Sequence, residues 1–346
     1  EIWAGLRQAH LDGIALGPEA ALPHHQRVLA VIDANAARFE YLREEALVAL
    51  ASNELDLMHI DDARAHLQEA LALTEAKLGP DHPAVATVVL DLAGCDLRDG
   101  QLARAEAGFA RVLRIRGFVV DDDDPTLAPV LTNLGAVRFS SGDVVGALPL
   151  FERALAIRTR QWGPEHIDLA PLLANLSFCL GRLGRKAEAL AASERALSIR
   201  MKALGPDHPN TGKAHHAVAI AARRNADLPR ARAQFERAIA VARRTEGTPE
   251  LYEPMVGLVE VLLELGEPRE VERRAAEALP GCEALEGVRT TCAMLEFAWA
   301  QAIAPRDPAA ALAKAESARR HLEGVEGEDG ARAELDAWIS THRAAR

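Results

Sequence analysis

Apolar residues recur along most of this chain at intervals of three and four, in segments that come in pairs. That spacing predicts amphipathic α-helices, each with one buried face. Residues 127–166 show the pattern most clearly. The inward positions there are Val130, Leu131, Leu134 and Val137 in the first segment, and Ala147, Leu150, Phe151, Ala154, Leu155 and Ile157 in the second.

Glycine marks the end of each segment in this stretch. Gly142-Asp143 separates the two predicted helices, and Gly163-Pro164 ends the second. Glycine tolerates left-handed dihedral angles, and proline cannot donate the next helical hydrogen bond. The small residue Gly135, with Ala147 and Ala154, lies where two helices must approach closely. The stretch therefore predicts a tightly packed helical hairpin.

The hairpin repeats at a fixed interval. Equivalent alanines are 42 residues apart, at Ala63, Ala105, Ala147, Ala189 and Ala231. One hairpin cannot bury its apolar face alone, so units of this kind stack on their neighbours as a solenoid. After Ala231 the interval to Val271 shortens to 40, and the regular pattern weakens.

The residues of the unit resemble the tetratricopeptide repeat. The family has a small residue at its eighth position and glycine at its fifteenth, and here these are Gly135 and Gly142. Its twentieth, twenty-fourth and twenty-seventh positions match Ala147, Phe151 and Ala154. The resemblance implies an all-α fold, a right-handed superhelical solenoid of helical hairpins.

The length of the unit and its linker resemble the kinesin light chain subtype of that family. The standard period is about 34 residues, whereas this chain uses 42. The linker Leu-Gly-Pro-Asp-His-Pro occurs at residues 78–83 and again at 204–209, with a variant at 162–166. Arrays of this form, rich in Ala, Leu and Arg, look like regions of large bacterial signalling proteins such as serine/threonine kinases.

The repeat divides the chain into four regions. We expect a divergent N-terminal repeat over residues 1–38, with its first helix at 1–16, and five 42-residue units over 39–248. Two shorter, degenerate units follow over 249–322. A capping helix is expected over 326–346, since the open end of a solenoid must be covered.

Composition narrows the classes of partner and the compartment. A net charge of −11 argues against nucleic acid, which requires a basic face. The chain has no secretory pattern and no apolar run of about 18 residues, so a membrane is not expected.

Cys95 and Cys179 occupy one repeat position and are expected to be buried, while Cys282 and Cys292 fall on different helices. No disulfide framework is predicted, and a reduced, cytoplasmic protein is the simplest interpretation. The first residue, Glu1, is not Met, so we expect a piece of a longer protein.

The resemblance also implies where a partner would bind. Proteins of this family hold extended peptides in a concave groove lined by the first helices. The groove positions here include Thr132, Asn133, Ala136, Phe139, Ala174, Asn175, Phe178, Arg182, Lys213, His216, Ile220 and Arg223. An amide has both a donor and an acceptor, so Asn133 and Asn175 can bracket a peptide unit. The alternative is that each bonds a neighbouring carbonyl or solvent.

The fifth unit differs from the others in its charge. It contains Lys213, His215, His216, Arg223, Arg224 and Arg230. An acidic peptide is one expectation for the partner, and an ordinary solvated face is the alternative. The carboxylate clamp of the chaperone-binding members is not expected, because only Asn175 and Lys213 match its pattern.

Catalytic and metal motifs are missing from the sequence. It contains no GxSxG, no phosphate-binding loop, no HExxH and no paired CxxC. The linker histidines His82, His166 and His208 recur with the repeat and are expected to cap helices. The acidic run at residues 121–124 lacks the alternating ligands of a calcium loop. No enzyme activity, cofactor or metal is predicted.

The sequence therefore favours a scaffold that binds a protein or peptide in its groove, as the recruitment region of a bacterial signalling protein. Two alternatives stay open. One is a region that senses a small molecule in a transcriptional or signalling switch, and the other is a non-catalytic part of a multidomain enzyme. The sequence leaves the oligomeric state undecided.

Overall fold

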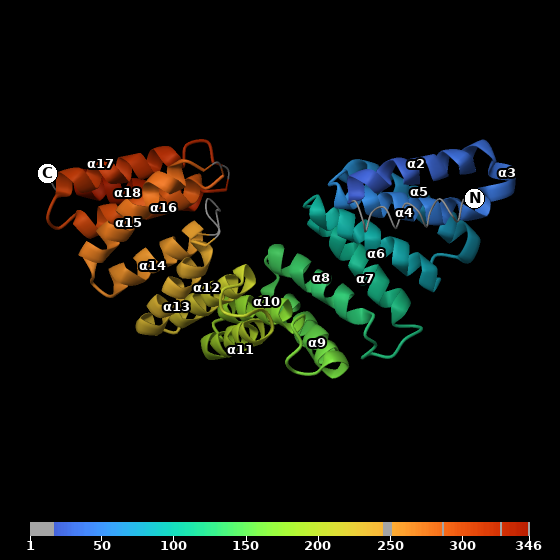
Figure 1. The fold of residues 1–346 in the computed structure, drawn as a ribbon, viewed down its shortest axis with the longest axis horizontal. Helices are drawn as coiled ribbons and strands as arrows, with labels where there is room; N and C mark the ends of the chain where they lie inside the picture. Colours follow the sequence, from blue (N-terminus) through green and yellow to red (C-terminus); the bar gives the residue numbers. More distant parts are fainter. Residues whose placement is uncertain (1–16, 245–250, 286, 326, 345–346) are drawn as a thin grey trace. The chain divides into compact units, whose positions relative to one another are not determined.

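The computed structural model describes residues 17–244, 251–285, 287–325 and 327–344, and every regular element in these ranges is a helix (Figure 1). The predicted first helix at residues 1–16 lies outside them. Contacts divide the chain into two units at Pro164. Unit 1 contains α2 (Pro18–Ala34), α3 (Ala36–Phe39), the short 3-10 helix η1 (Glu40–Leu42), α4 (Arg43–Asp56), α5 (Ile60–Leu78), α6 (Pro83–Arg98), α7 (Leu102–Arg116), α8 (Leu127–Ser140) and α9 (Val144–Trp162).

Unit 2 continues the same succession of helices. It contains α10 (Leu169–Arg182), α11 (Lys186–Leu204), α12 (Pro209–Arg224), α13 (Leu228–Ala242), α14 (Tyr252–Glu264), α15 (Pro268–Glu283), α16 (Arg289–Ile303), α17 (Pro308–His321) and α18 (Asp329–Ala344). In both units each helix packs against the next in the chain. The fold is the expected all-α solenoid of helical hairpins. None of the helices in the described ranges combines the length and the apolar character needed to cross a membrane.

Backbone conformation explains where the long helices end. Gly79, Gly163 and Gly205 follow α5, α9 and α11 and have φ angles of 88°, 85° and 83°. Left-handed dihedrals of this kind carry almost no steric penalty in glycine. The repeating Leu-Gly-Pro or Trp-Gly-Pro sequence therefore sets the length of the hairpin.

Close packing within the hairpin depends on small residues, as predicted. A Cβ atom added to Gly135 of α8 would lie 2.9 Å from the ring of Phe151 of α9. Phe151 is 2% exposed, so its ring is fixed by the surrounding core. Ala147 and Ala154 on α9 are fully buried. Glycine at position 135 thus lets the aromatic side chain lie directly against the backbone of the neighbouring helix.

Each unit has its own apolar core. In unit 1, Phe109 and Ile115 of α7 pack with Val85 and Val89 of α6 and with Leu134 of α8. In unit 2, the buried residues of α12 to α16 form one cluster that includes Phe235, Met255 and Leu295. Leu335 and Ile339 of α18 pack against α16 and α17, where the sequence predicts a capping helix.

The cysteines depart from the prediction at one place. Cys282 of α15 and Cys292 of α16 form a disulfide, with a Cα–Cα distance of 5.8 Å. The expectation that no cysteine pairs is therefore wrong for these two. They do lie on different helices, but the turn between α15 and α16 brings the end of one to the start of the other. Cys95 and Cys179 are free and buried, as expected.

Candidate functional site

A hollow of unit 2 lies on the first helices of successive hairpins. It is a cleft of about 530 Å³ between α12, α14 and α16, with one residue from α13. Clefts of about 300–1,000 Å³ are typical of sites that hold a ligand or a side-chain anchor. Its apolar wall consists of Ile220, Phe235, Val256, Gly257 and Met294. Its polar rim consists of His216, Arg223, Arg224, Glu253, Glu260, Glu264 and Thr291.

The apolar wall is shaped by one glycine. A Cβ atom on Gly257 would lie 2.3 Å from Cζ of Phe235, so any side chain there would displace the ring. Phe235 is 1% exposed, whereas Met294 of α16 is 42% exposed. An exposed, flexible thioether beside a rigid aromatic wall suits an apolar guest, because methionine adapts its shape at little cost.

Arg223 does not supply the free positive charge that the sequence suggested. Its Nε donates to Glu264 Oε1 at 2.6 Å, and its Nη1 pairs with Glu260. Three carboxylates, from Glu253, Glu260 and Glu264, line the cleft against two guanidinium groups. The expected positive end of the groove is therefore not found at this cleft, and the acidic peptide inferred from it stays a prediction. The acidic partners of Arg223 come from the next hairpin, 37 and 41 residues later.

The two histidines of α12 have different surroundings. His216 lines the cleft, with its ring centroid 5.7 Å from that of Phe235. Burial lowers the pKa of His216 more than the Glu253 carboxylate raises it, so a neutral imidazole is favoured at pH 7. His215 is buried, and its Nδ1 lies 2.6 Å from Oε1 of Gln234. Burial also lowers the pKa of His215, so neither ring adds charge to the cleft.

Asn133 of α8 and Asn175 of α10 are half-buried, each in its own unit. Within the described ranges, no hydrogen bond joins either side-chain amide to another residue. Thr132, next to Asn133, behaves differently, because its hydroxyl donates to the carbonyl of Ala128 at 2.8 Å. The two asparagines thus do not bond back to their helices, and their donors and acceptors are available to a partner.

The structure brings together only part of the predicted groove set. His216, Ile220 and Arg223 line the cleft. Phe178 is 40% exposed and lies with Ile220 and Arg224 at a smaller recess. Arg182 and Lys213 are exposed, and Phe139 is half-buried in unit 1. The cleft residues of α14 and α16 were missed, because their hairpins fall after the point where the 42-residue interval shortens. Of the two partners of Arg223, only Glu264, which lies 41 residues later, falls close to one repeat offset.

Two of the three linker histidines cap helices, as expected, whereas the N-cap residue of α10 is Asp168 rather than His166. His82 and His208 are the N-cap residues of α6 and α12, and each accepts a hydrogen bond from a backbone N–H two residues later, at 3.1 Å. His166 accepts from the N–H of Asp168 at 3.3 Å. In the acidic run, Asp124 accepts from the hydroxyl of Thr126 at 2.5 Å and from its N–H at 2.8 Å, and these hydrogen bonds lower the pKa of Asp124.

Comparison with known proteins agrees with this architecture. The tetratricopeptide repeat family matches residues 42–117, 126–202 and 174–244. The chain belongs to the tetratricopeptide repeat family. No curated protein matches it.

Solved tetratricopeptide structures share the fold at low sequence identity. A putative kinesin light chain repeat protein of Podosopora anserina is 22% identical, with a TM-score of 0.53, over 60% of this chain and 98% of that one. BtubC (BKLC) of P. vanneervenii is 20% identical, with a TM-score of 0.53, over 70% and 92%. The apo form of RapI is 11% identical, with a TM-score of 0.70, over 99% and 97%.

Proposed function

We propose that this protein is an interaction scaffold that binds an extended peptide or partner segment along the first helices of its hairpins. The observation that carries the proposal is the cleft between α12, α14 and α16, which combines an apolar wall with a charged rim. Asn133 and Asn175 support it, since their amides make no bond to their own helices.

The chemistry of the cleft favours one kind of anchor. An apolar side chain would lie against Phe235, Val256 and Met294. Carboxylates outnumber guanidinium groups on the rim, and Glu253 is exposed. Since complementary charge steers a partner and fixes its register, we propose that a lysine or arginine of the peptide neighbours this anchor.

Selection from a displayed library of random peptides would test the proposal. We expect selected peptides to share an apolar residue beside a basic one. Met294→Glu places a charge in the cleft without removing a core residue, and should weaken binding of a selected peptide at least about tenfold, the range of a central interface residue. Fluorescence anisotropy of the labelled peptide measures this change.

Met201→Glu is the matched control. Met201 is 39% exposed, close to the 42% of Met294, but it belongs to α11, the second helix of its hairpin. Met201→Glu should leave the affinity for the selected peptide unchanged. Equal effects of the two substitutions would contradict binding in the cleft. Glu253→Lys should weaken the same peptide, and a peptide with an acidic residue in place of the basic one should regain affinity for that variant.

The asparagines are tested separately. Asn175→Ala should weaken peptides of unrelated sequence by a similar factor, because an amide contacts the peptide backbone rather than its side chains. Asn210→Ala is the control, since Asn210 is exposed at the start of α12. A loss of affinity that differs from one peptide sequence to another would argue against a contact with the peptide backbone.

We also propose that the scaffold recruits partners within a larger bacterial signalling protein such as a serine/threonine kinase. The support is the resemblance of its 42-residue, Ala-, Leu- and Arg-rich units to arrays in such proteins. The complete coding sequence tests this proposal. A kinase or regulator domain in the same polypeptide is expected, and a coding sequence that contains only repeats would contradict it.

A further inference from the structure

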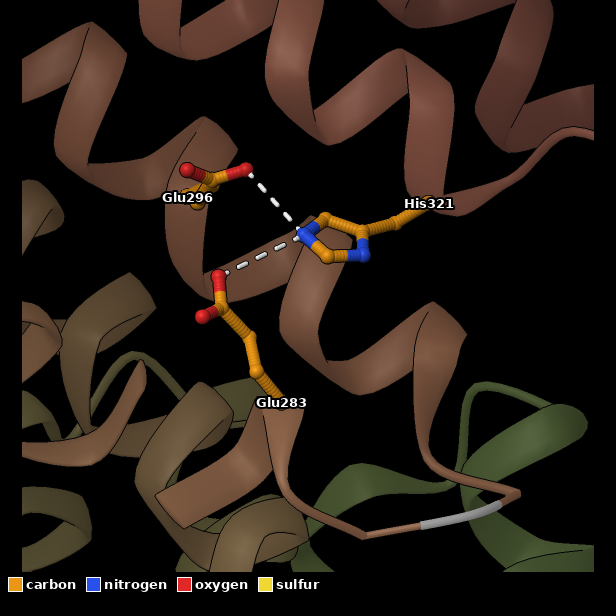
Figure 2. Close-up of side chains that lie close together, drawn as sticks. All are labelled: Glu283, Glu296 and His321. Carbon is orange, nitrogen blue, oxygen red and sulfur yellow. Dashed lines mark ion pairs between the residues drawn. The ribbon is translucent and has the colours of Figure 1, made fainter. Parts of the chain in front are cut away.

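Three side chains that can bind metal meet at one end of the last two hairpins of unit 2. They are Glu283 of α15, Glu296 of α16 and His321 of α17. His321 Nε2 lies 3.7 Å from Glu283 Oε1 and 3.5 Å from Glu296 Oε2. Figure 2 shows the imidazole nitrogen pointing toward both carboxylates. One ligand atom from each residue lies within 4.8 Å of the other two.

Glu296 is the unusual member of this cluster. The residue is 5% exposed, and its Oε2 atom is buried without a hydrogen-bond partner among the described residues. Its other oxygen, Oε1, lies 3.9 Å from Nζ of Lys314, which is itself held 3.6 Å above the Trp299 ring. A buried carboxylate oxygen without a donor is costly. A cation placed between Oε2 and His321 would compensate that cost.

The two separations around His321 suit a tetrahedral transition metal. Zn²⁺ binds histidine nitrogen and carboxylate oxygen at about 2.0–2.2 Å, which sets neighbouring ligands about 3.3–3.6 Å apart. The two separations around His321 lie at or just above this range. One imidazole and two carboxylates suit zinc, whereas magnesium prefers oxygen ligands alone.

Helix ends add to the attraction for a cation. Glu283 is the last residue of α15, and His321 is the last residue of α17. The carbonyl end of a helix carries a partial negative charge that favours cations. Glu283 also follows Cys282, whose disulfide to Cys292 joins α15 to the helix that contains Glu296. The backbone that positions the two carboxylates is thus covalently tied.

We propose that Glu283, Glu296 and His321 form a zinc site that links α15, α16 and α17. The protein supplies three ligands, and water completes the coordination. Since the ligands come from three successive helices, bound zinc stabilises the C-terminal hairpins of unit 2 and not the groove residues of α12. The site shares α16 with the cleft, but none of its three ligands lines the cleft.

Zinc binding to the full chain, without an affinity tag, tests the proposal. Titration with ZnCl₂ against a competing chelator should show a site that is lost in the variants. Removal of a supporting residue of a metal site costs roughly 10–100-fold in affinity, so Glu296→Gln and His321→Gln should each cost about 100-fold or more. ZnCl₂ should raise the Tm of the wild type and leave that of the variants unchanged.

Glu283→Gln is the cluster variant expected to stay folded, because the Glu283 side chain is 50% exposed. It should retain the circular dichroism of the wild type and lose affinity at least about tenfold. His66→Gln is the matched control, because among the described residues His66 pairs with one carboxylate, that of Glu54 at 2.8 Å. This variant should bind zinc like the wild type. The proposal is overturned if the wild type takes up no zinc, if MgCl₂ competes equally, or if the cluster variants bind as the His66 variant does.

Discussion

Within unit 2, the regular hairpins of α10 to α13 and the later helices α14 to α18 are stabilised by different means. In the regular hairpins, residues of the repeat end, cap and pack the helices. They include left-handed Gly205, the N-cap His208 and the alanine contacts. The later helices add interactions that have no counterpart in the described part of α10 to α13. These are the Cys282–Cys292 disulfide, buried Glu296 beside His321, and the stacking of Trp338 on His342 at 3.7 Å.

This difference shows where along the chain the hairpins stop sharing the same stabilising contacts. A regular unit stabilises its neighbours through identical interfaces, so one sequence pattern serves many junctions. Once the interval shortens after Ala231, the junctions differ and each needs its own contacts. The cleft lies at this transition, since it joins α12 of the regular region to α14 and α16. The predictions below test whether the two regions differ as described.

The largest expected effect is loss of the disulfide. A closed loop with a sequence separation of 10 residues should contribute about 3 kcal/mol. Cys282→Ala with Cys292→Ala should lower the free energy of unfolding of α14 to α18 by about that amount. Urea titration followed by tryptophan fluorescence measures it, in a background where Trp3 and Trp162 are replaced by phenylalanine so that Trp299 and Trp338 alone report. Reductant should destabilise the wild type and leave the double variant unchanged, and equal sensitivity of both would contradict the account.

A smaller loss is expected from overpacking at the cleft. Gly257→Ala would place its Cβ atom 2.3 Å from Phe235, against 2.9 Å from Val241 for Gly212→Ala in α12. Overpacking costs about 1–3 kcal/mol, which the better helix propensity of alanine partly offsets. We expect Gly257→Ala to cost about 1–2 kcal/mol and Gly212→Ala to cost less. Thermal unfolding of the two variants in parallel gives the order, and the reverse order would show that the wall of the cleft is adaptable.

The helix caps should be equal in the two regions. His208 accepts from the N–H of Asn210, and Asp307 accepts from that of Ala310 at the start of α17. Replacing either by alanine should cost about 1 kcal/mol, as for other N-caps. Denaturant midpoints measure both. A cost confined to His208→Ala would mean that the later helices do not depend on capping.

The smallest effect concerns acid stability in α15. The hydrogen bond from Arg273, with that from Arg274, lowers the pKa of Glu270 from 4.5 to about 2. A carboxylate with a depressed pKa stabilises the folded state above pH 4.5 and loses that contribution as the pH falls toward 2. Arg273 is more than half exposed, so the gain is under about 1 kcal/mol. Glu270→Gln should therefore flatten the stability profile between pH 4.5 and 2. A profile identical to that of the wild type would show that solvent screens the pair completely.

Periodicity predicted the part of the fold that repeats. Gly163, the close approach of Gly135 to Phe151 and the capping histidines all follow from local chemistry that recurs in each unit. Glu264, one partner of Arg223, was within reach of the same reasoning, since it lies 41 residues later, close to one repeat.

Features that occur once could not be predicted in this way. Cys282 and Cys292 pair because the end of α15 lies close to the start of α16, and their spacing has no counterpart elsewhere in the chain. Glu283, Glu296 and His321 meet because the ends of α15 and α17 both reach α16. Contacts of this kind depend on how the helices pack in three dimensions and not on the repeating residue pattern.

The central claim is that partners bind along the first helices of the hairpins, and amide hydrogen exchange tests it most directly. Exchange should be recorded for unit 2 with and without a selected peptide. The account predicts slowed exchange in α12, α14 and α16, with α11, α13 and α15 unchanged. Protection concentrated in α11, α13 and α15 would contradict it and place the partner on the second helices instead.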